Sequence, residues 1–402
     1  MKIRYIFYLL VPLVIGGLAS LTGFSLLWRL FILSLLLLVV AYLWSYFSLR
    51  NIKYQIRNVP VKGQTGDKLE SLITLSNPGG LPKIGLHLKE FSDIPDYQNE
   101  TVFNLIPHNS LAVTSEIIFK RRGHYSLGHY QLDASDPLGL FKSTKRIGVK
   151  QEISIYPATL LLPFFDPLHY MSQGYGPGRW LSSQISANVA SIRDYTMGDS
   201  LKHIHWRTTA HSDKMMVKVF DPDRSQSSAK TIWLISDMDK DAQAGSGTDS
   251  TEEYNVTLCA SIAKKYIELD WPVGFISQAE KPYHYPIESG SQQLEYLQAS
   301  LASIQARGQI PIEQVILREI HRFNVNSLTI IVTSSWNEQM VKALMQLRRH
   351  QGMVVAILLD SGSFGGRRSM PNIPASLIQL GIQVYVIKSG DNLNMALDSR
   401  KI

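Results

Sequence analysis

The stretch TIWLISDMDKD, residues 231–241, joins a short apolar run to a cluster of three aspartates. A continuous apolar run of this length is typical of a strand that is buried on both faces. Further runs follow at VGFIS, LTIIVTSS, MVVAILLD and IQVYVIK, and amphipathic helical patterns such as NEQMVKALMQLRRH separate most of them. Buried strands that alternate with helices predict an open, mainly parallel α/β sheet within residues 229–402.

The aspartates follow the first predicted strand, and TSSWN, residues 333–337, follows a later one. Open α/β sheets bind ligands outside the carboxyl ends of their strands, so both segments are candidate site residues. Asp237, Asp239 and Asp241 could hold a hard cation such as Mg²⁺ through their oxygens. They could equally form a solvated loop, which we favour because the polar run KDAQAGSGTDS continues from them.

The N-terminal region contains two long apolar runs. Residues 5–28 and 30–49 carry no charge, and only Arg29 separates them. Each run exceeds the roughly 20 residues that a helix needs to cross the hydrocarbon core. Because Gly23 suits a turn between them, residues 1–50 predict a two-helix transmembrane hairpin. A cleaved signal peptide is the alternative, but it has a single, shorter apolar core.

Basic residues flank both apolar runs and are absent from the turn between them. Lys2 and Arg4 precede the first run, and Arg50, Lys53 and Arg57 follow the second. Positive charge marks the cytoplasmic side of a membrane protein. We therefore expect a multi-pass protein whose soluble part faces the cytoplasm.

The net charge of +7 belongs mostly to this region. The first 60 residues hold six basic residues and no acidic one, and the remainder holds 34 basic and 33 acidic residues. Such charge favours anionic membrane lipids as a partner. It argues against nucleic acid, which needs a basic face on the soluble part. Cys259, the only cysteine, fits a reducing compartment.

Residues 51–157 show a different pattern, with short strand-like runs such as KLESLITLSN and SLAVTSEIIFK. The segments NPGGLP and IPHNS provide turns between runs. Many short strands with this punctuation predict a small β-sandwich, and a twisted open sheet is the alternative. Residues 158–228 then form a connecting segment, which begins with an irregular, aromatic-rich and glycine-rich stretch.

Residues 191–220, SIRDYTMGDSLKHIHWRTTAHSDKMMVKVF, concentrate charged and aromatic side chains in this connecting segment. Arg193 and Asp199 are six positions apart with Gly198 between them, which is consistent with a turn that brings them together. A buried ion pair against Trp206 would brace the segment, and removal of one partner of such a pair costs about 3–5 kcal/mol.

The alternative role for this stretch is a docking surface. Trp, Tyr and Arg dominate binding hot spots, and the candidates here are Arg193, Tyr195, Trp206 and Arg207. A zinc site is a further option that we weigh at His203, His205 and His211. Zinc requires a third and usually a fourth ligand, so structural histidines are the interpretation that we favour.

Several elements of the sequence resemble the bacterial domain-of-unknown-function-58 family. They are RRGHYSLG (121–128), DPLGLF (136–141), IYP (155–157) and a signature formed by Arg193, Tyr195, Gly198, Asp199, Ile204, Trp206, Ala210, Val217 and Lys218. The resemblance runs from about residue 50 to the end. Lys202 and His211 depart from it, because the family usually has arginine at both positions. Lysine does not replace arginine in two-pronged pairing.

The resemblance implies a von Willebrand factor A-like fold for residues 229–402, the bacterial inner membrane as location, and a MoxR-type AAA+ ATPase as partner. In that fold an Asp-x-Ser-x-Ser motif and a later Asp hold Mg²⁺. Asp239 and Asp241 replace both serines here, and Ser334 stands where the later Asp is expected. The resemblance therefore implies a degenerate metal site.

No motif for a phosphate loop, a nucleophile elbow or a metalloprotease helix is present in the sequence. We therefore predict a non-enzymatic, membrane-anchored interaction or adaptor protein without a cofactor, active in assembly or envelope-related processes. The alternative is a metal-dependent hydrolase that uses Asp237, Asp239 and Asp241.

Overall fold

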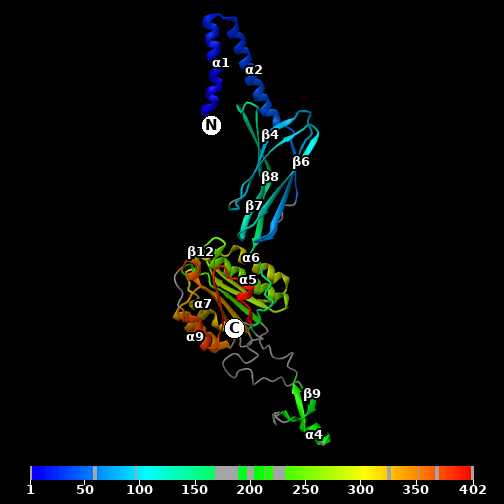
Figure 1. The fold of residues 1–402 in the computed structure, drawn as a ribbon, viewed down its shortest axis with the longest axis vertical. Coiled ribbons are helices and arrows are strands. Elements are labelled where there is room, and N and C mark those ends of the chain that lie inside the picture. Colours follow the sequence, from blue (N-terminus) through cyan, green and yellow to red (C-terminus); the bar gives the residue numbers. More distant parts are fainter. Residues whose placement is uncertain are drawn as a thin grey trace. The chain divides into compact units, whose positions relative to one another are not determined.

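The computed structural model describes residues 2–57, 61–95, 97–167, 189–196, 203–212, 214–220, 231–323, 327–351, 353–366 and 371–399. The chain divides into two units, Met1–Tyr156 and Pro157–Ile402, and each is described by itself (Figure 1). The segment limits expected at residues 50 and 228 stay predictions.

The first unit begins with two helices, α1 (Lys2–Thr22) and α2 (Ser25–Ser48). They lie side by side, joined through Gly23, whose φ of +65° suits the reversal of the chain. α2 is long and apolar enough to cross a membrane, and residues 10–22 of α1 form a shorter apolar helix. The apolar N-terminal helix expected from the sequence is therefore present.

The described residues of the first unit then form the strands β1 (Lys53–Arg57), β2 (Lys62–Gln64), β3 (Lys68–Asn77), β4 (Lys83–Phe91), β5 (Asn99–Leu105), β6 (Asn109–Ile118), β7 (Gly123–Ser135) and β8 (Lys142–Tyr156). They form two sheets, with strand orders β1-β3-β6 and β2-β8-β7-β4-β5. Ile73 and Leu75 of the smaller sheet share one core with Leu86 and Leu132 of the larger sheet. The two sheets therefore face each other, as in a small β-sandwich, and do not form one open sheet.

A pair of glycines bends the long β7–β8 ladder. The pairing of the two strands shifts register between Leu127 and His129. Opposite this shift, Gly128 and Gly148 have φ angles of +80° and +82°. A methyl group at Gly148 would lie 2.1 Å from the carbonyl oxygen of Gly128. Only glycine accommodates this bulge.

A buried lysine joins the end of α2 to the sandwich. Lys83, at the start of β4, is 5% exposed, and its ammonium donates to the carbonyl oxygens of Phe47 and Arg50. Those carbonyls lie at the carboxyl end of α2, where backbone acceptors lack helical partners and a positive charge is favourable. Burial lowers the pKa of the Lys83 ammonium.

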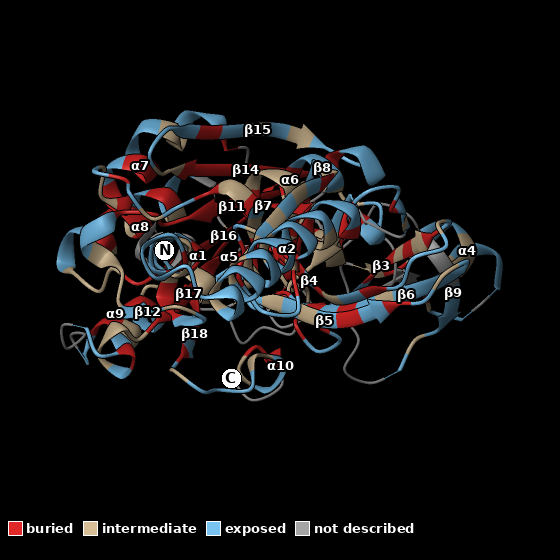
Figure 2. Cartoon of the chain, turned by 90° about the horizontal axis from the view of Figure 1, so that it is seen from above, coloured by how far each residue is buried: buried red, intermediate tan, exposed pale blue. Residues whose placement is uncertain are grey.

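The second unit contains a six-stranded sheet in the order β15-β14-β11-β16-β17-β18. Its strands are β11 (Thr231–Ser236), β14 (Val273–Gln278), β15 (Pro282–Glu288), β16 (Ser327–Thr333), β17 (Met353–Leu359) and β18 (Gln383–Ile387). All neighbours pair in parallel except β14 and β15, which are antiparallel. The mainly parallel α/β sheet predicted from the apolar runs is confirmed. Figure 2 shows β14 mostly buried and the edge strand β15 largely exposed.

Helices cover both faces of this sheet. They are α5 (Thr251–Glu268), α6 (Ser291–Ser303), α7 (Ile312–Glu319), α8 (Glu338–Gln351), α9 (Ile373–Gln379) and α10 (Leu393–Ala396). One core packs α5 and α6 against the sheet, and a second core packs α7, α8 and α9 against the other face. Alternate strand residues therefore enter different cores, which explains why the strand sequences are apolar throughout.

Two further parts precede this sheet in the second unit. β9 (Val189–Asp194) and β10 (Met216–Phe220) form a two-stranded antiparallel sheet, accompanied by α4 (Trp206–Ser212). Residues 158–167 have little regular structure, as expected, but they are firmly packed. Phe165 is buried in the α5 core, and the Lys265 ammonium donates to the carbonyl oxygen of Leu162 at 2.8 Å.

Candidate functional site

Asp237 is the centre of the strongest polar cluster at the carboxyl ends of the strands. It directly follows β11, and Thr333 and Ser335 lie at the end of the parallel neighbour β16. Both hydroxyls donate to Asp237 Oδ2, Thr333 at 2.6 Å and Ser335 at 2.8 Å. The backbone N–H of Asp239 donates to Oδ1 at 3.1 Å. The two segments selected from the sequence therefore meet.

The environment of Asp237 sets its charge. The residue is 1% exposed. Burial raises the pKa of the Asp237 carboxyl to about 6, and the hydrogen bonds from Thr333 and Ser335 limit that rise. The carboxylate is thus ionised at neutral pH and stabilised by donors from its own chain.

Sequence reasoning missed Asn255, which connects the same strand ends to α5. The Asn255 amide donates to the carbonyl oxygens of Asp237 and Val332, each at 3.1 Å, and accepts from the Ser236 hydroxyl at 2.8 Å. Asn255 is fully buried. The available signal was an amide on the apolar face of the helix, four positions before Cys259.

The other two aspartates have local backbone roles. Asp239 accepts from the backbone N–H of Asp241 at 3.3 Å and begins the short 3₁₀ helix Lys240–Ala242. Burial raises the pKa of Asp239, and the nearby Asp241 charge adds to that rise. Asp241 itself is exposed.

The residues present do not fit an Mg²⁺ site. Across the described ranges, no group of three or more His, Cys, Asp or Glu side chains is arranged to hold a metal ion. Asp237 already accepts two hydroxyl protons and one backbone proton. This donor set satisfies the carboxylate without a cation.

The signature of the connecting segment is described in part, because Gly198, Asp199 and Lys202 lie outside the described residues. Arg193 Nη1 donates to the carbonyl oxygen of Asp194 and to the Thr196 hydroxyl, each at 3.1 Å. The pairing of Arg193 with Asp199 stays a prediction.

The aromatic part of the signature lies at the surface. Trp206 is 68% exposed and begins α4, where Arg207 is also exposed. Tyr195 is half-buried, and its backbone N–H donates to the Met215 carbonyl oxygen at 2.9 Å. Exposed Trp and Arg on one short helix are the side chains that a docking surface requires.

His205 has a structural role. Its Nδ1 accepts from the backbone N–H of Thr208 at 3.1 Å and lies 2.7 Å from the Thr208 hydroxyl. The same Thr208 N–H also donates to the His205 carbonyl oxygen at 3.0 Å, so two His205 acceptors hold the first turn of α4. The choice between structural histidines and a zinc site at His203, His205 and His211 stays a prediction.

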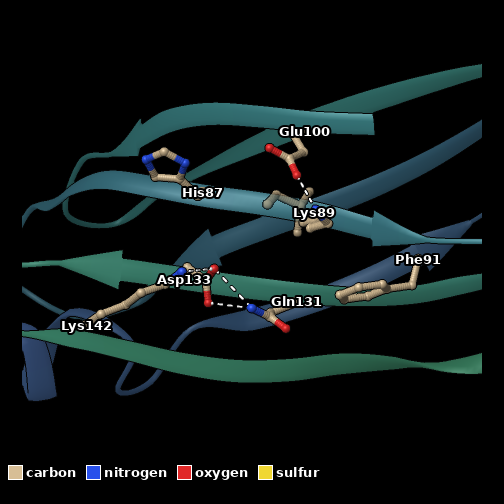
Figure 3. Close-up of a pocket in the computed structure, with 8 residues that line it drawn as sticks. His87, Lys89, Phe91, Glu100, Gln131, Asp133 and Lys142 are labelled. Carbon is tan, nitrogen blue, oxygen red and sulfur yellow. Dashed lines mark hydrogen bonds and ion pairs between the residues drawn. The ribbon is translucent and has the colours of Figure 1, made fainter. Parts of the chain in front are cut away.

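A shallow hollow lies on the outer face of the larger sandwich sheet (Figure 3). Its charged groups pair with one another: Lys142 contacts Asp133 at 2.7 Å, and Lys89 pairs with Glu100. Burial raises the pKa of the Asp133 carboxyl, but hydrogen bonds, above all from Lys142, hold it below its usual value. This internal pairing leaves the hollow without an unpaired charge to offer a ligand.

Comparison with known proteins finds a family model that matches part of the chain. Residues 191–361 match the model of the family described as "Protein of unknown function DUF58". The chain is also similar to the uncharacterized protein YeaD of Bacillus subtilis (strain 168). The two are 22% identical over 282 residues, which cover 70% of this chain and 67% of that protein.

Two solved structures show weak partial likeness. The complex of zinc 2-glycoprotein and prolactin inducible protein from human seminal plasma matches 25% of this chain and 92% of its own, at 11% identity and a TM-score of 0.21. The PapD-like domain 7 of human CEP192 matches 26% of this chain and 87% of its own, at 17% identity and a TM-score of 0.20. These scores are too low to support an argument about fold or function.

Proposed function

Since residues 191–361 match the DUF58 family model, we propose that the chain is a membrane-anchored, non-enzymatic interaction protein of the bacterial inner membrane. Its soluble part faces the cytoplasm and binds a MoxR-type AAA+ ATPase. The ATPase and the bacterial inner membrane come from the family resemblance, and the other parts of the proposal have support in the chain itself.

The anchor is a transmembrane hairpin of α1 and α2. The length and apolarity of α2 support it, and so does the reversal of the chain at Gly23. Basic residues at the amino end of α1 and after α2, with none in the turn at Gly23, favour cytoplasmic ends. A fluorescent protein fused after Ile402 should mature and fluoresce in cells. Activity of a periplasmic phosphatase reporter at the same position would contradict this orientation.

The second unit is a von Willebrand factor A-like domain in this proposal. Support comes from its strand order, with the first strand β11 in the interior and the chain continuing outward on both sides. This is the 3-2-1-4-5-6 order of doubly wound sheets, whose ligands bind where the strand order reverses. In this sheet the order reverses between β11 and β16, and Asp237 directly follows β11 there.

The observation that carries the non-enzymatic assignment is the state of Asp237. The carboxylate at the position where such sheets bind ligands is 1% exposed, and hydrogen bonds from the same chain occupy both of its oxygens. A catalytic or metal-binding carboxylate needs an accessible oxygen. Asp237 instead joins β11 to β16.

Calorimetry tests this assignment directly. Titration of the detergent-solubilised chain with Mg²⁺, Mn²⁺ or Ca²⁺ should give no site tighter than about millimolar, which is weak for a resident cation. Micromolar binding that Asp237→Asn abolishes, accompanied by hydrolytic activity, would instead favour the metal-dependent hydrolase with Asp237, Asp239 and Asp241 as ligands.

Co-purification tests the partner. Trp206 and Arg207 are the exposed hot-spot residues of α4, so Trp206→Ala should reduce recovery of the ATPase from membrane extracts by about tenfold or more. His211→Ala, also exposed on α4, is the matched control and should retain recovery. Equal recovery with both variants would exclude this helix as the docking surface, and no ATPase with the native chain would contradict the partnership.

A further inference from the structure

The carboxyl-terminal turns of α2 lie beside one end of the sandwich. The Tyr42 ring meets the Phe141 ring edge-on at 5.7 Å between centroids. One helical turn later, the Ser45 and Ser143 hydroxyls are 2.9 Å apart. The connection between β7 and β8, residues 136–141, therefore lies next to α2 at the level of Tyr42, before the helix ends.

Most N–H groups of this β7–β8 turn are paired within the turn. The Asp136 carboxylate accepts from the N–H groups of Leu138 at 3.0 Å and Phe141 at 2.6 Å, and the Asp136 carbonyl accepts from Gly139 at 3.0 Å. Gly139 has a φ of +68°, which a tight turn requires. A turn with internally paired N–H groups tolerates a site that is poor in water.

The exposed side chain of this turn is apolar. Leu138 is 54% exposed, and the other exposed residues of the turn, Pro137 and Gly139, carry no charge. Two other loops at this end of the sandwich also expose one aliphatic side chain each, Leu81 at 60% and Ile106 at 61%. Asn77 holds both loops, because its amide donates to the Leu81 carbonyl at 2.8 Å and to the Ile106 carbonyl at 3.4 Å.

The length of α2 relates this end to a bilayer. Residues 25–41, which precede the contact with Phe141, rise about 26 Å at 1.5 Å per residue. A hydrocarbon core is about 30 Å thick. If α2 spans it, the helix reaches the far boundary only at or beyond Tyr42. The β7–β8 turn then lies at that boundary too, at the level where Trp44 and Tyr46 would form an aromatic belt.

We propose that the β7–β8 turn inserts Leu138 into the interfacial region of the bilayer that α2 crosses, so that this end of the sandwich is a second membrane contact. This inference rests on the proposed membrane anchor. We infer that lipid covers Leu138 because the turn contacts the proposed membrane helix α2 through Phe141 and Ser143. The turn also exposes an aliphatic side chain while most of its N–H groups are paired. Apolar side chains bind interfaces in this way through burial of their surface.

Depth-dependent fluorescence quenching tests the inference on the full chain in proteoliposomes. Single cysteines replace Leu138, Ile118 and Leu36, and each carries an environment-sensitive fluorophore. Ile118 is 51% exposed at the opposite end of β6, so it is the matched control, and Leu36 reports on α2 itself. The native Cys259 is buried, and its thiol pKa is raised to about 12, so the unsubstituted chain provides the labelling blank.

The quenchers are lipids with a nitroxide near the headgroup or deep in the acyl chain. The probe at Leu138→Cys should lose about half of its emission with the shallow quencher, as expected for interfacial burial. The probe at Leu36→Cys should respond most to the deep quencher, and the probe at Ile118→Cys should respond to neither.

Each other outcome overturns a defined statement. Quenching at position 36 without quenching at 138 contradicts the second contact, leaves the anchor intact and makes this end available to a protein partner. No quenching at position 36 contradicts the anchor and the inference together. Equal quenching at 138 and 118 indicates general adsorption of the sandwich and contradicts a specific contact by the turn.

Discussion

The two units each bury one charged side chain at the point that holds their parts together, and the two charges are satisfied in different ways. Lys83 of the first unit is 5% exposed and Asp237 of the second unit is 1% exposed. Burial favours the neutral form of each, because it lowers the pKa of Lys83 and raises that of Asp237. Lys83 donates to backbone carbonyls at the end of α2, whereas Asp237 accepts mainly from the hydroxyls of Thr333 and Ser335.

The difference concerns adaptability. Carbonyls at a helix end are fixed by the helix, so Lys83 specifies one position of α2 against β4. Hydroxyl protons rotate, and a hydroxyl also accepts hydrogen bonds, so the partners of Asp237 can adjust to a neutral group. We therefore expect Asp237 to tolerate an isosteric replacement, and Lys83 to tolerate none that lacks a donor.

Asp237→Asn gives the largest expected effect, as a dependence on pH. The folded-state pKa of about 6 lies above the ordinary aspartate pKa of 3.8, so the folded chain retains a proton that the unfolded chain releases. The stability from this group is complete below about pH 4 and is lost as pH rises through 6, by about 3 kcal/mol. The variant lacks this loss. Denaturant titrations between pH 4 and 7 should therefore show the free energy of unfolding of the variant rising relative to that of the native chain as pH increases.

The exposed carboxylate of Asp241 supplies the control, since Asp241→Asn removes the same charge from the same loop. This variant should not reproduce the gain of Asp237→Asn, because Asp241 only adds to the raised pKa of Asp239. If Asp237→Asn and the native chain run parallel across this range, the buried carboxylate is not the group that titrates.

Asn255→Leu tests the hydrogen bonds between α5 and the backbone at the same strand ends. The variant removes the amide's hydrogen bonds to the carbonyls of Asp237 and Val332, which keep the donors Gln243 Nε2 and Asp237 N–H. It also removes the acceptor of the buried Ser236 hydroxyl, and we expect a total cost of about 2 kcal/mol. Thermal unfolding measures the loss. Gln292→Leu, an exposed amide on α6, should leave the midpoint nearly unchanged. A similar midpoint for both leucine variants would mean that Asn255 does not join α5 to the sheet.

Lys83→Met has the smallest expected effect of these variants. It tests the hydrogen bonds from Lys83 to the carbonyls at the end of α2. The methionine keeps the apolar stem but removes the ammonium donor from the carbonyls of Phe47 and Arg50. The Phe47 carbonyl still accepts from the Arg50 N–H at 3.3 Å, and we expect a cost of about 1.5 kcal/mol. Chemical unfolding of the detergent-solubilised chain should show it. Lys89→Met, from an exposed pair on the same strand, is the matched control. An equal loss of unfolding free energy in both variants would show that the buried position of Lys83 does not strengthen its hydrogen bonds.

The sequence predicted the sheet of the second unit well, because the signal is local. Every residue of β16 is buried, and the run LTIIVT shows this directly. The alternation in β3, where every second residue from Ser71 to Asn77 is buried, likewise distinguishes a sheet with one covered face. The family expected from the signature is confirmed over residues 191–361.

The site was predicted only in part, because its contacts depend on pairing across the chain. The position of Asp237 at a strand end follows from the sequence. Its hydroxyl partners depend on the register between β11 and β16, which are 96 positions apart at Asp237 and Thr333. Asn255 depends on how α5 is rotated over the sheet. No local pattern reports either property.

The glycine pair at positions 128 and 148 divides the longest ladder of the first unit into two shorter ones. Because the backbones approach so closely there, saturation mutagenesis at position 148 should recover glycine alone among folded variants. β8 then behaves as two strands in series, and its amide protons on either side of the bulge should exchange with solvent in two separate groups.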